Sequence, residues 1–121
     1  MAEPLVLNLS FSRFDAELAT NADLWNGILS RSQSNSGYLT IVLTDRTLYD
    51  VSIICLSREQ VRSYAALYGI DASSFEDEWD LFWRVVDELL SRSDYDGYVH
   101  VPPEVSGGDF GCIILYKLVN R

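Results

Sequence analysis

Apolar residues recur at every second position near the start of the chain, from Leu5 to Phe11. A period of two is typical of a strand with one buried face, because successive side chains of a strand point to opposite sides. We therefore expect a first strand over residues 4–12. Ser12 and Asp15 then have the S-x-x-D spacing that opens many helices.

The helix that begins there is expected to run to about Leu29, with a break near Asn21. Residues 30–37 (SRSQSNSG) contain four serines, an asparagine and a glycine. This composition is typical of a loop.

Two apolar stretches, residues 38–43 and 48–56, are separated by the polar segment TDRT and predict a β-hairpin. Ser57 opens an S-x-x-Q capping box, so a helix is expected from there through Tyr68. Gly69 is placed where a glycine commonly ends a helix.

A further helix is expected over residues 73–90 (SSFEDEWDLFWRVVDELL), where Ser73 and Glu76 have capping-box spacing. Its large apolar residues recur at helical spacing and predict one inward stripe. That stripe consists of Phe75, Trp79, Phe82, Trp83, Val86 and Leu90. We expect both tryptophans to serve mainly as core residues.

Two last strands are expected at residues 98–101 and 111–119, joined by the long loop PPEVSGGDF. The predicted order is β-α-β-β-α-α-β-β, with about five strands and three to four helices. Strands and helices do not alternate strictly in this order. The sequence therefore predicts a single α+β domain over residues 1–121 with a mostly antiparallel sheet.

No apolar run approaches the roughly 20 residues of a membrane helix. The N-terminal segment MAEPLVLNLSFS lacks the basic start and long apolar stretch of a secretory signal. We expect a soluble, cytoplasmic protein. Cys55 and Cys112 lie in apolar, strand-like runs. We expect them to be buried, reduced thiols without a functional role, and a disulfide between them is the alternative.

Charge is distributed unevenly along the chain, which carries 18 acidic and 9 basic residues and a formal net charge of −9. Residues 71–109 hold eleven acids and only two bases, Arg84 and Arg92, so this stretch alone accounts for the −9. Such a surplus argues against direct binding to nucleic acid, which depends on Lys and Arg. It favours a basic protein partner, or serves solubility alone.

We expect these acids to form one acidic, partner-binding face. The candidate residues are Glu76, Asp77, Asp80, Asp87, Asp94, Asp96, Glu104 and Asp109. In size and charge the chain is similar to bacterial nuclease immunity proteins and phage-encoded anti-defence proteins, a similarity of class rather than of motif. The leading hypothesis is a small inhibitor that blocks a basic, nucleic-acid-handling surface of a partner, with carboxylates in place of phosphates. Monomer and homodimer stay open, and so does a structural or regulatory module in which the acids have no special role.

Candidate catalytic and metal-binding groups are few. If the last two strands form a hairpin, His100 and Cys112 would lie opposite each other, and a thiol beside an imidazole is the minimum for a cysteine nucleophile. Asp96 or Asp109 could orient the histidine. Against this, Cys112 lies in the run FGCIILY, which is typical of a core strand. One histidine and no thiol pair argue against zinc. The SGGD turn leads into a strand, whereas phosphate-binding loops lead into a helix. We assign no catalytic residue, no metal site and no cofactor.

The segment SDYDGYVHV (residues 93–101), the loop after it and the last apolar strand resemble the C-terminal end of ADP-ribosyltransferase-like domains. The resemblance covers about thirty residues. It implies an alternative function, a small or degenerate enzyme with an ADP-ribosyltransferase-like C-terminal half. The N-terminal Arg or His, the Ser-Thr-Ser-like strand and the catalytic Glu-x-Glu of those enzymes cannot be placed in this chain.

Overall fold

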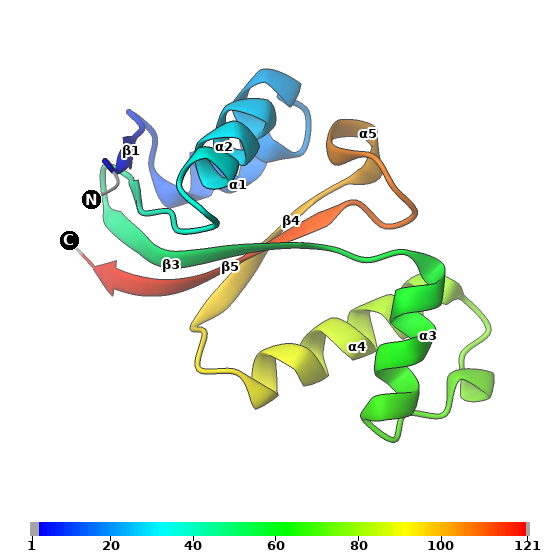
Figure 1. Ribbon diagram of the computed structural model, residues 1–121. Coiled ribbons are helices and arrows are strands. Elements are labelled where there is room, and N and C mark those ends of the chain that lie inside the picture. Colours follow the sequence, from blue (N-terminus) through cyan, green and yellow to red (C-terminus); the bar gives the residue numbers. More distant parts are fainter. Residues whose placement is uncertain (1–2, 121) are drawn as a thin grey trace.

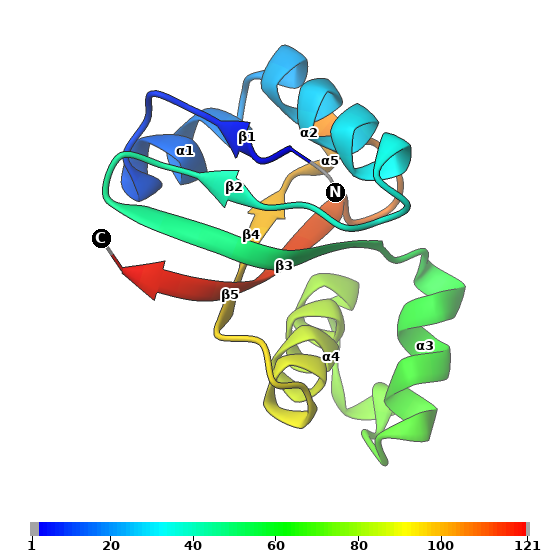
Figure 2. The same ribbon diagram turned by 60° about the vertical axis from the view of Figure 1, so that its left-hand side comes forward.

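A five-stranded sheet runs through the middle of the molecule in the computed structural model, which describes residues 3–120 (Figures 1 and 2). The strand order is β1-β2-β3-β5-β4. The strands are β1 (Leu5–Val6), β2 (Ile41–Val42), β3 (Arg46–Cys55), β4 (Gly97–Val101) and β5 (Cys112–Asn120). β1 pairs with β2 in parallel and all other neighbours are antiparallel. The predicted α+β class with a mostly antiparallel sheet is confirmed.

Helices cover both faces of this sheet (Figure 1). The upper face in Figure 1 carries α1 (Phe11–Leu18), α2 (Ala22–Ser34) and the short α5 (Pro103–Ser106). The lower face carries α3 (Arg58–Leu67) and α4 (Glu78–Arg92), with the 3-10 turn η1 (Ala72–Ser74) between them. The sheet therefore separates two hydrophobic cores, an upper core and a lower core.

The central strand β5 contributes to both cores because its side chains alternate between the two faces. Cys112, Ile114 and Tyr116 lie in the upper core, and Ile113 and Leu115 lie in the lower core. A strand that is buried on both faces needs an almost continuous apolar run, which the sequence CIILY supplies.

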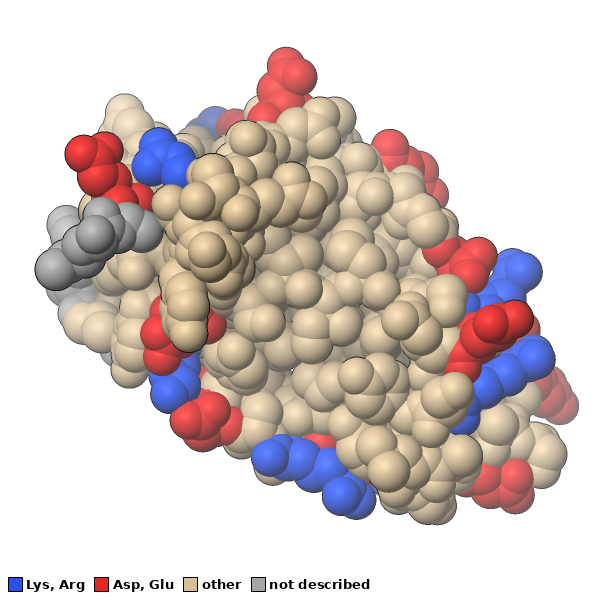
Figure 3. Space-filling model, in the orientation of Figure 1, with Lys and Arg blue, Asp and Glu red and all other residues tan. Residues whose placement is uncertain are grey.

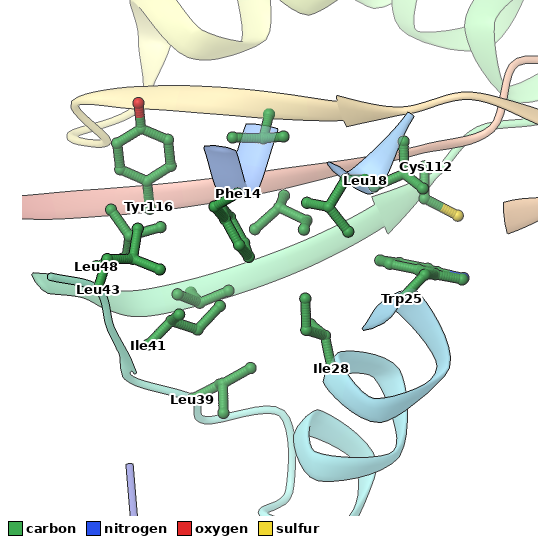
Figure 4. Packing of buried hydrophobic residues seen from close by; sticks show 14 residues of the cluster. Phe14, Leu18, Trp25, Ile28, Leu39, Ile41, Leu43, Leu48, Cys112 and Tyr116 are labelled. Carbon is green, nitrogen blue, oxygen red and sulfur yellow. The ribbon is translucent and has the colours of Figure 1, made fainter. Parts of the chain in front are cut away.

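The upper core is built from two helices and the sheet (Figure 4). Phe14 and Leu18 of α1 and Trp25 and Ile28 of α2 point toward the strands, and all four are buried. Every second residue from Leu5 onward also packs against this core, as its spacing predicts. The predicted strand over residues 4–12 is nevertheless too long, because the chain turns into α1 after Ser10.

Two helix boundaries in the N-terminal half differ from the predicted ones. The N-cap of α1 is Ser10, not Ser12, and the first helical residue, Phe11, donates its N–H to the Asp45 carboxylate over 2.9 Å. This contact joins positions 34 residues apart, so no local pattern contains it. α2 continues to Ser34 through most of the serine-rich segment predicted as a loop, and its residue Ser32 is buried.

The beginning of α4 also corrects the sequence prediction. Asp77 is the N-cap and accepts the N–H of Trp79 over 2.8 Å, whereas Ser73 lies in η1 and donates to the Asp71 carboxylate. The predicted capping box of Ser73 and Glu76 is therefore wrong. The buried side of α4 is formed by Leu81, Phe82, Val85 and Val86. The two tryptophans pack on the lower core but are only half-buried.

Other local predictions are confirmed. The predicted break near Asn21 forms, since α1 ends at Leu18 and Asn21 caps α2 by accepting the N–H of Leu24. Ser57 forms the predicted capping box of α3, and Gly69 follows that helix with a φ of 71°. The hairpin of β2 and β3 also forms. The loop of residues 102–110, by contrast, contains α5, which the sequence did not predict.

Cys55 and Cys112 form a disulfide between directly paired positions of β3 and β5, so the expectation of reduced thiols is wrong. Cys112 is buried, but Cys55 at the end of its strand is exposed. Disulfides persist mainly in oxidising compartments, which is at odds with the expected cytoplasmic location. Within residues 3–120, no helix has the length and apolar character needed to cross a bilayer.

The disulfide joins positions 57 residues apart. We expect its reduction to lower the free energy of unfolding by about 2–4 kcal/mol, because the unfolded chain regains the conformational freedom that the cross-link removes. Urea unfolding of the wild type with and without reductant measures this difference. In the double variant Cys55→Ala/Cys112→Ala the reductant should change nothing. Equal stability of the oxidised and reduced wild type would show that the bond does not stabilise the fold.

Candidate functional site

The eight acids predicted to bind a partner do not form one continuous face. Glu76, Asp77, Asp80 and Asp87 lie on the exposed side of α4 and in the turn before it. Glu104 lies in α5, on the opposite face of the sheet. Of the other three, Asp94 and Asp96 lie in the connection from α4 to β4, and Asp109 lies in the connection from α5 to β5.

Several of these acids have a structural role, because their carboxylates accept backbone N–H groups. Asp77 caps α4, Asp96 accepts the N–H of Leu118 over 2.7 Å, and Asp109 accepts the N–H of Arg58 at the start of α3 over 2.9 Å. Asp71 holds η1 in the same way through Ser73, and the hydrogen bonds from Ser73 lower the pKa of the Asp71 carboxyl. These carboxylates are explained by the fold itself.

Other acids are paired with bases. Glu78 lies 2.7 Å from Arg58 and 3.0 Å from Arg62, both of which belong to α3. Figure 3 shows acidic and basic side chains next to each other at the end of the molecule where α3 lies. Glu88 accepts hydrogen bonds from Arg84 and from Arg92, which lower the pKa of its carboxyl. The surplus counted along residues 71–109 is therefore partly balanced in space.

Three exposed carboxylates on the α4 side have neither a hydrogen bond nor an ion pair among the described residues, and we call Glu76, Asp80 and Asp87 the acid ridge. Asp80 and Asp87 are two helical turns apart, about 10 Å along the axis. Next to the ridge lies a hollow of about 390 Å³. Its lining includes the side chains of Phe75 and Leu81 together with acidic groups of residues 76–78 and Arg62.

A second charged site surrounds Lys117 on the lower face of the sheet. The Lys117 Nζ lies 2.8 Å from the Asp94 carboxylate and 3.7 Å from that of Asp50. Asp50 has a φ of 49° at a bulge of β3, where it and Val51 both oppose Tyr116 of β5. A hollow of about 360 Å³ beside these groups is also lined by tyrosines. The tyrosines are Tyr38 and Tyr95.

Sequence reasoning missed the Lys117 site, since it assigned Asp94 to the partner-binding face and gave no role to Asp50 or Lys117. Their positions span residues 50–117, so only the folded sheet brings them together. The hydrogen bond and charge of Lys117 lower the pKa of the Asp94 carboxyl, and those of Asp94 raise the pKa of Lys117. Asp50 adds to the raised pKa of Lys117 through its charge.

The suggested pairing of His100 with Cys112 does not form. The partner of His100 in the sheet is Ile113, so His100 faces the lower core while Cys112 faces the upper core and is bonded to Cys55. The Nε2 of His100 donates to the Phe110 carbonyl oxygen over 2.7 Å, and its ring lies 4.8 Å from that of Trp83. Both contacts are those of a residue at the border of the lower core.

A metal site would need several nitrogen, sulfur or oxygen ligands close together. No three His, Cys, Asp or Glu side chains of residues 3–120 lie together in a way that could hold a metal ion. The SGGD turn precedes β5, and its Asp109 carboxylate accepts the N–H of Arg58 at the start of α3.

Comparisons of the chain with protein-family models, with curated proteins and with solved structures found no match. The positions and charges of the chain's own side chains therefore carry the inference of a function.

The Lys117 site can be tested by pH titration. The pKa of Asp94 is lower in the folded protein than in the unfolded chain. The pair therefore stabilises the fold fully above about pH 4, the ordinary pKa of an Asp carboxyl. This stabilisation is lost as the pH falls through the lowered, folded-state pKa. We expect Lys117→Met to raise the pKa of Asp94 toward that of an ordinary Asp carboxyl, because the hydrogen bond and the charge of Lys117 are lost. NMR titration of the side-chain carboxyl carbons measures this change. Asp71, whose pKa is lowered by Ser73, is the internal control and should not move.

An unchanged Asp94 titration in Lys117→Met would show that the ion pair does not persist in solution. A shift of both Asp94 and Asp71 would instead indicate a general change of the fold rather than the loss of this pair.

Proposed function

We propose that the protein is a small, non-catalytic binding protein of the inhibitor or immunity type. It docks through the acid ridge of α4 on a basic protein surface that normally handles nucleic acid. The observation that carries the proposal is the acid ridge beside an apolar-walled hollow, because this combination fits the side chains that such surfaces present.

The hollow suits a long basic side chain of the partner. The aliphatic stem of a Lys or Arg can pack on Phe75 and Leu81 while its charged head reaches the carboxylates of Glu76 and Asp77. Arg62 already pairs with Glu78 at this place, so one of the three acids of residues 76–78 is balanced within the chain. Of the acids that line the hollow, Glu76 is then the one whose charge no ion pair or hydrogen bond among the described residues offsets.

Electrostatic complementarity of this kind mainly accelerates association and selects the partner. Asp80 and Asp87 extend the charge of Glu76 along the helix, and their axial separation of about 10 Å covers about three phosphate steps of a nucleic-acid strand. Exposed charges contribute little to stability, so the ridge is free to serve binding. The net charge of −9 strengthens attraction to a basic partner at long range.

We expect the triple variant Glu76→Lys/Asp80→Lys/Asp87→Lys to lose its partner. The experiment is affinity capture from native-host extract with the wild type and the variant, followed by association-rate measurement on the captured protein. The wild-type rate should fall as salt is raised toward about 0.5 M, where charges more than a few Å apart are screened.

A second triple variant, Asp15→Lys/Asp23→Lys/Glu104→Lys, is the matched control, since it makes the same change of net charge at exposed positions of α1, α2 and α5 on the other face of the sheet. The control should keep the partner and most of the rate. Equal rates for the wild type and the ridge variant would contradict the proposal. Equal losses in both variants would reduce it to a general effect of net charge.

A further inference from the structure

The outer edge of β4 has no partner strand among residues 3–120. β4 is the last strand in the order β1-β2-β3-β5-β4, so its main chain pairs with β5 on one side only. In an edge strand every second residue directs its N–H and C=O groups away from the sheet. Within the described part of the chain, no group outside β5 hydrogen-bonds to the main chain of residues 97–100. This edge can therefore pair with a strand of another molecule.

β4 also lacks the features that normally keep an edge strand from pairing. Natural proteins protect such edges by keeping them very short, or by placing proline or charged side chains in them. The opposite edge of this sheet is protected in this way, because β1 has only two residues and comes directly after Pro4. β4 is five residues long, and its sequence GYVHV contains no Pro, Lys, Arg, Asp or Glu. This difference between the two edges indicates that the β4 edge is kept open for a partner.

One side of α4 packs against the lower side of β4. The ring centre of Trp83 lies 6.2 Å from that of Tyr98 and 4.8 Å from that of His100, and both of these residues belong to β4. Asp80 and Asp87 are three residues before and four residues after Trp83, so they lie on the same side of the helix. Burial raises the pKa of the Tyr98 hydroxyl and the charge of Asp87 raises it further, which agrees with this placement. Two exposed carboxylates of the acid ridge therefore lie alongside β4.

We propose that the β4 edge binds an extended, basic segment of a partner protein, which adds to the five-stranded sheet as a further strand. This inference rests on the proposed function, because Asp80 and Asp87 belong to the acid ridge, and it adds the form of the segment that the partner presents. The unpaired main-chain groups of β4 require a strand. The two carboxylates select Lys or Arg at the positions of that strand that face α4. Side chains two or four positions apart in a strand are about 7 or 13 Å apart, so long basic side chains reach two carboxylates about 10 Å apart.

The same charges disfavour a second copy of the chain at this edge. Antiparallel pairing of two β4 strands about a two-fold axis would place both copies of α4 on the same side of the joined sheet. Two acid ridges would then lie next to each other, and each chain carries a formal net charge of −9. A basic segment neutralises the ridge instead, so charge complementarity favours it over a second copy.

NMR of the isotope-labelled full chain with a probe peptide tests the proposal. The probe is the blocked peptide Lys-Val-Lys-Val-Lys-Val-Lys, whose lysines all lie on one face of a strand. At about 1 mM peptide, binding should shift the amides of residues 97–101, slow their hydrogen exchange and give cross-strand contacts between Hα protons of the peptide and of β4. The control peptide has the same sequence with every backbone amide N-methylated, which keeps the charge and removes the donors of the strand ladder. It should bind at least about tenfold more weakly, because several hydrogen bonds are lost.

Two charge variants test the role of the carboxylates beside β4. Asp80→Asn/Asp87→Asn should weaken binding of the lysine peptide about fivefold, because two exposed ion pairs are lost. Asp23→Asn/Glu104→Gln is the matched control, since it removes the same charge from exposed positions of α2 and α5 on the upper face of the sheet. It should bind the peptide like the wild type.

Equal affinities of the two peptides would overturn the proposal, because charge alone would then hold the peptide. The proposal is also wrong if the peptide leaves the β4 amides unshifted, or if these amides shift with protein concentration alone, which would place a second copy at the edge. Failure of the acid ridge is recognised separately. If the peptide pairs with β4 but the variant Glu76→Lys/Asp80→Lys/Asp87→Lys still captures the partner, the proposed function is wrong. If that variant loses the partner but no peptide pairs with β4, the edge proposal is wrong and the ridge stands.

Discussion

The long antiparallel pairing of β3 with β5 is the interaction on which the rest of the molecule depends. It runs from Arg46 to Cys55, and its register decides which core each side chain enters. The pairing is held at one end by the disulfide and interrupted by the bulge at Asp50, which lies at the Lys117 site. β2 joins the sheet at the outer edge of β3 and β4 at the outer edge of β5, and β1 extends the sheet beyond β2.

The same pairing explains why one half of the lower face is open. α3 follows directly from the end of β3 that carries Cys55, and α4 packs against α3, so both helices lie beneath that half of the sheet. The opposite ends of β3 and β5 pair with each other beyond the reach of the two helices. A continuous sheet with helices on only part of one face therefore leaves Val6 and Val119 in contact with water.

Charge counted along the sequence and charge placed in space differ in this protein. Residues 71–109 hold the whole acid surplus, but Asp77 and Asp109 accept N–H groups at the starts of α4 and α3, and Glu78 binds two arginines of α3. A linear count cannot show such roles, because each depends on a partner elsewhere in the fold. The acid ridge is what is left after these roles are subtracted, and it is smaller than the face expected from the sequence.

Periodicity and capping spacings predicted the fold class, the hairpin of β2 and β3, the break at Asn21 and the start of α3, since these depend on neighbouring residues. The sequence predictions were wrong where contacts between residues far apart in the chain determine the structure. Asp45 moves the start of α1 to Phe11, and the register of β3 and β5 brings Cys55 to Cys112. Of the candidate site, the exposed acids of α4 could be predicted from helical spacing. The Lys117 site could not, because it depends on which strands pair and in which register.

Amide hydrogen exchange followed residue by residue tests the central role of the β3–β5 pair most directly. If this pairing organises the molecule, the amides of Ile113, Ile114 and Leu115 exchange only when the whole protein unfolds, so their exchange free energies equal the global free energy of unfolding. The short β1 and α5 should open at a lower free energy. If the Ile114 amide exchanged as fast as the amides of α5 while the global free energy of unfolding stayed unchanged, the β3–β5 pair would not organise the molecule.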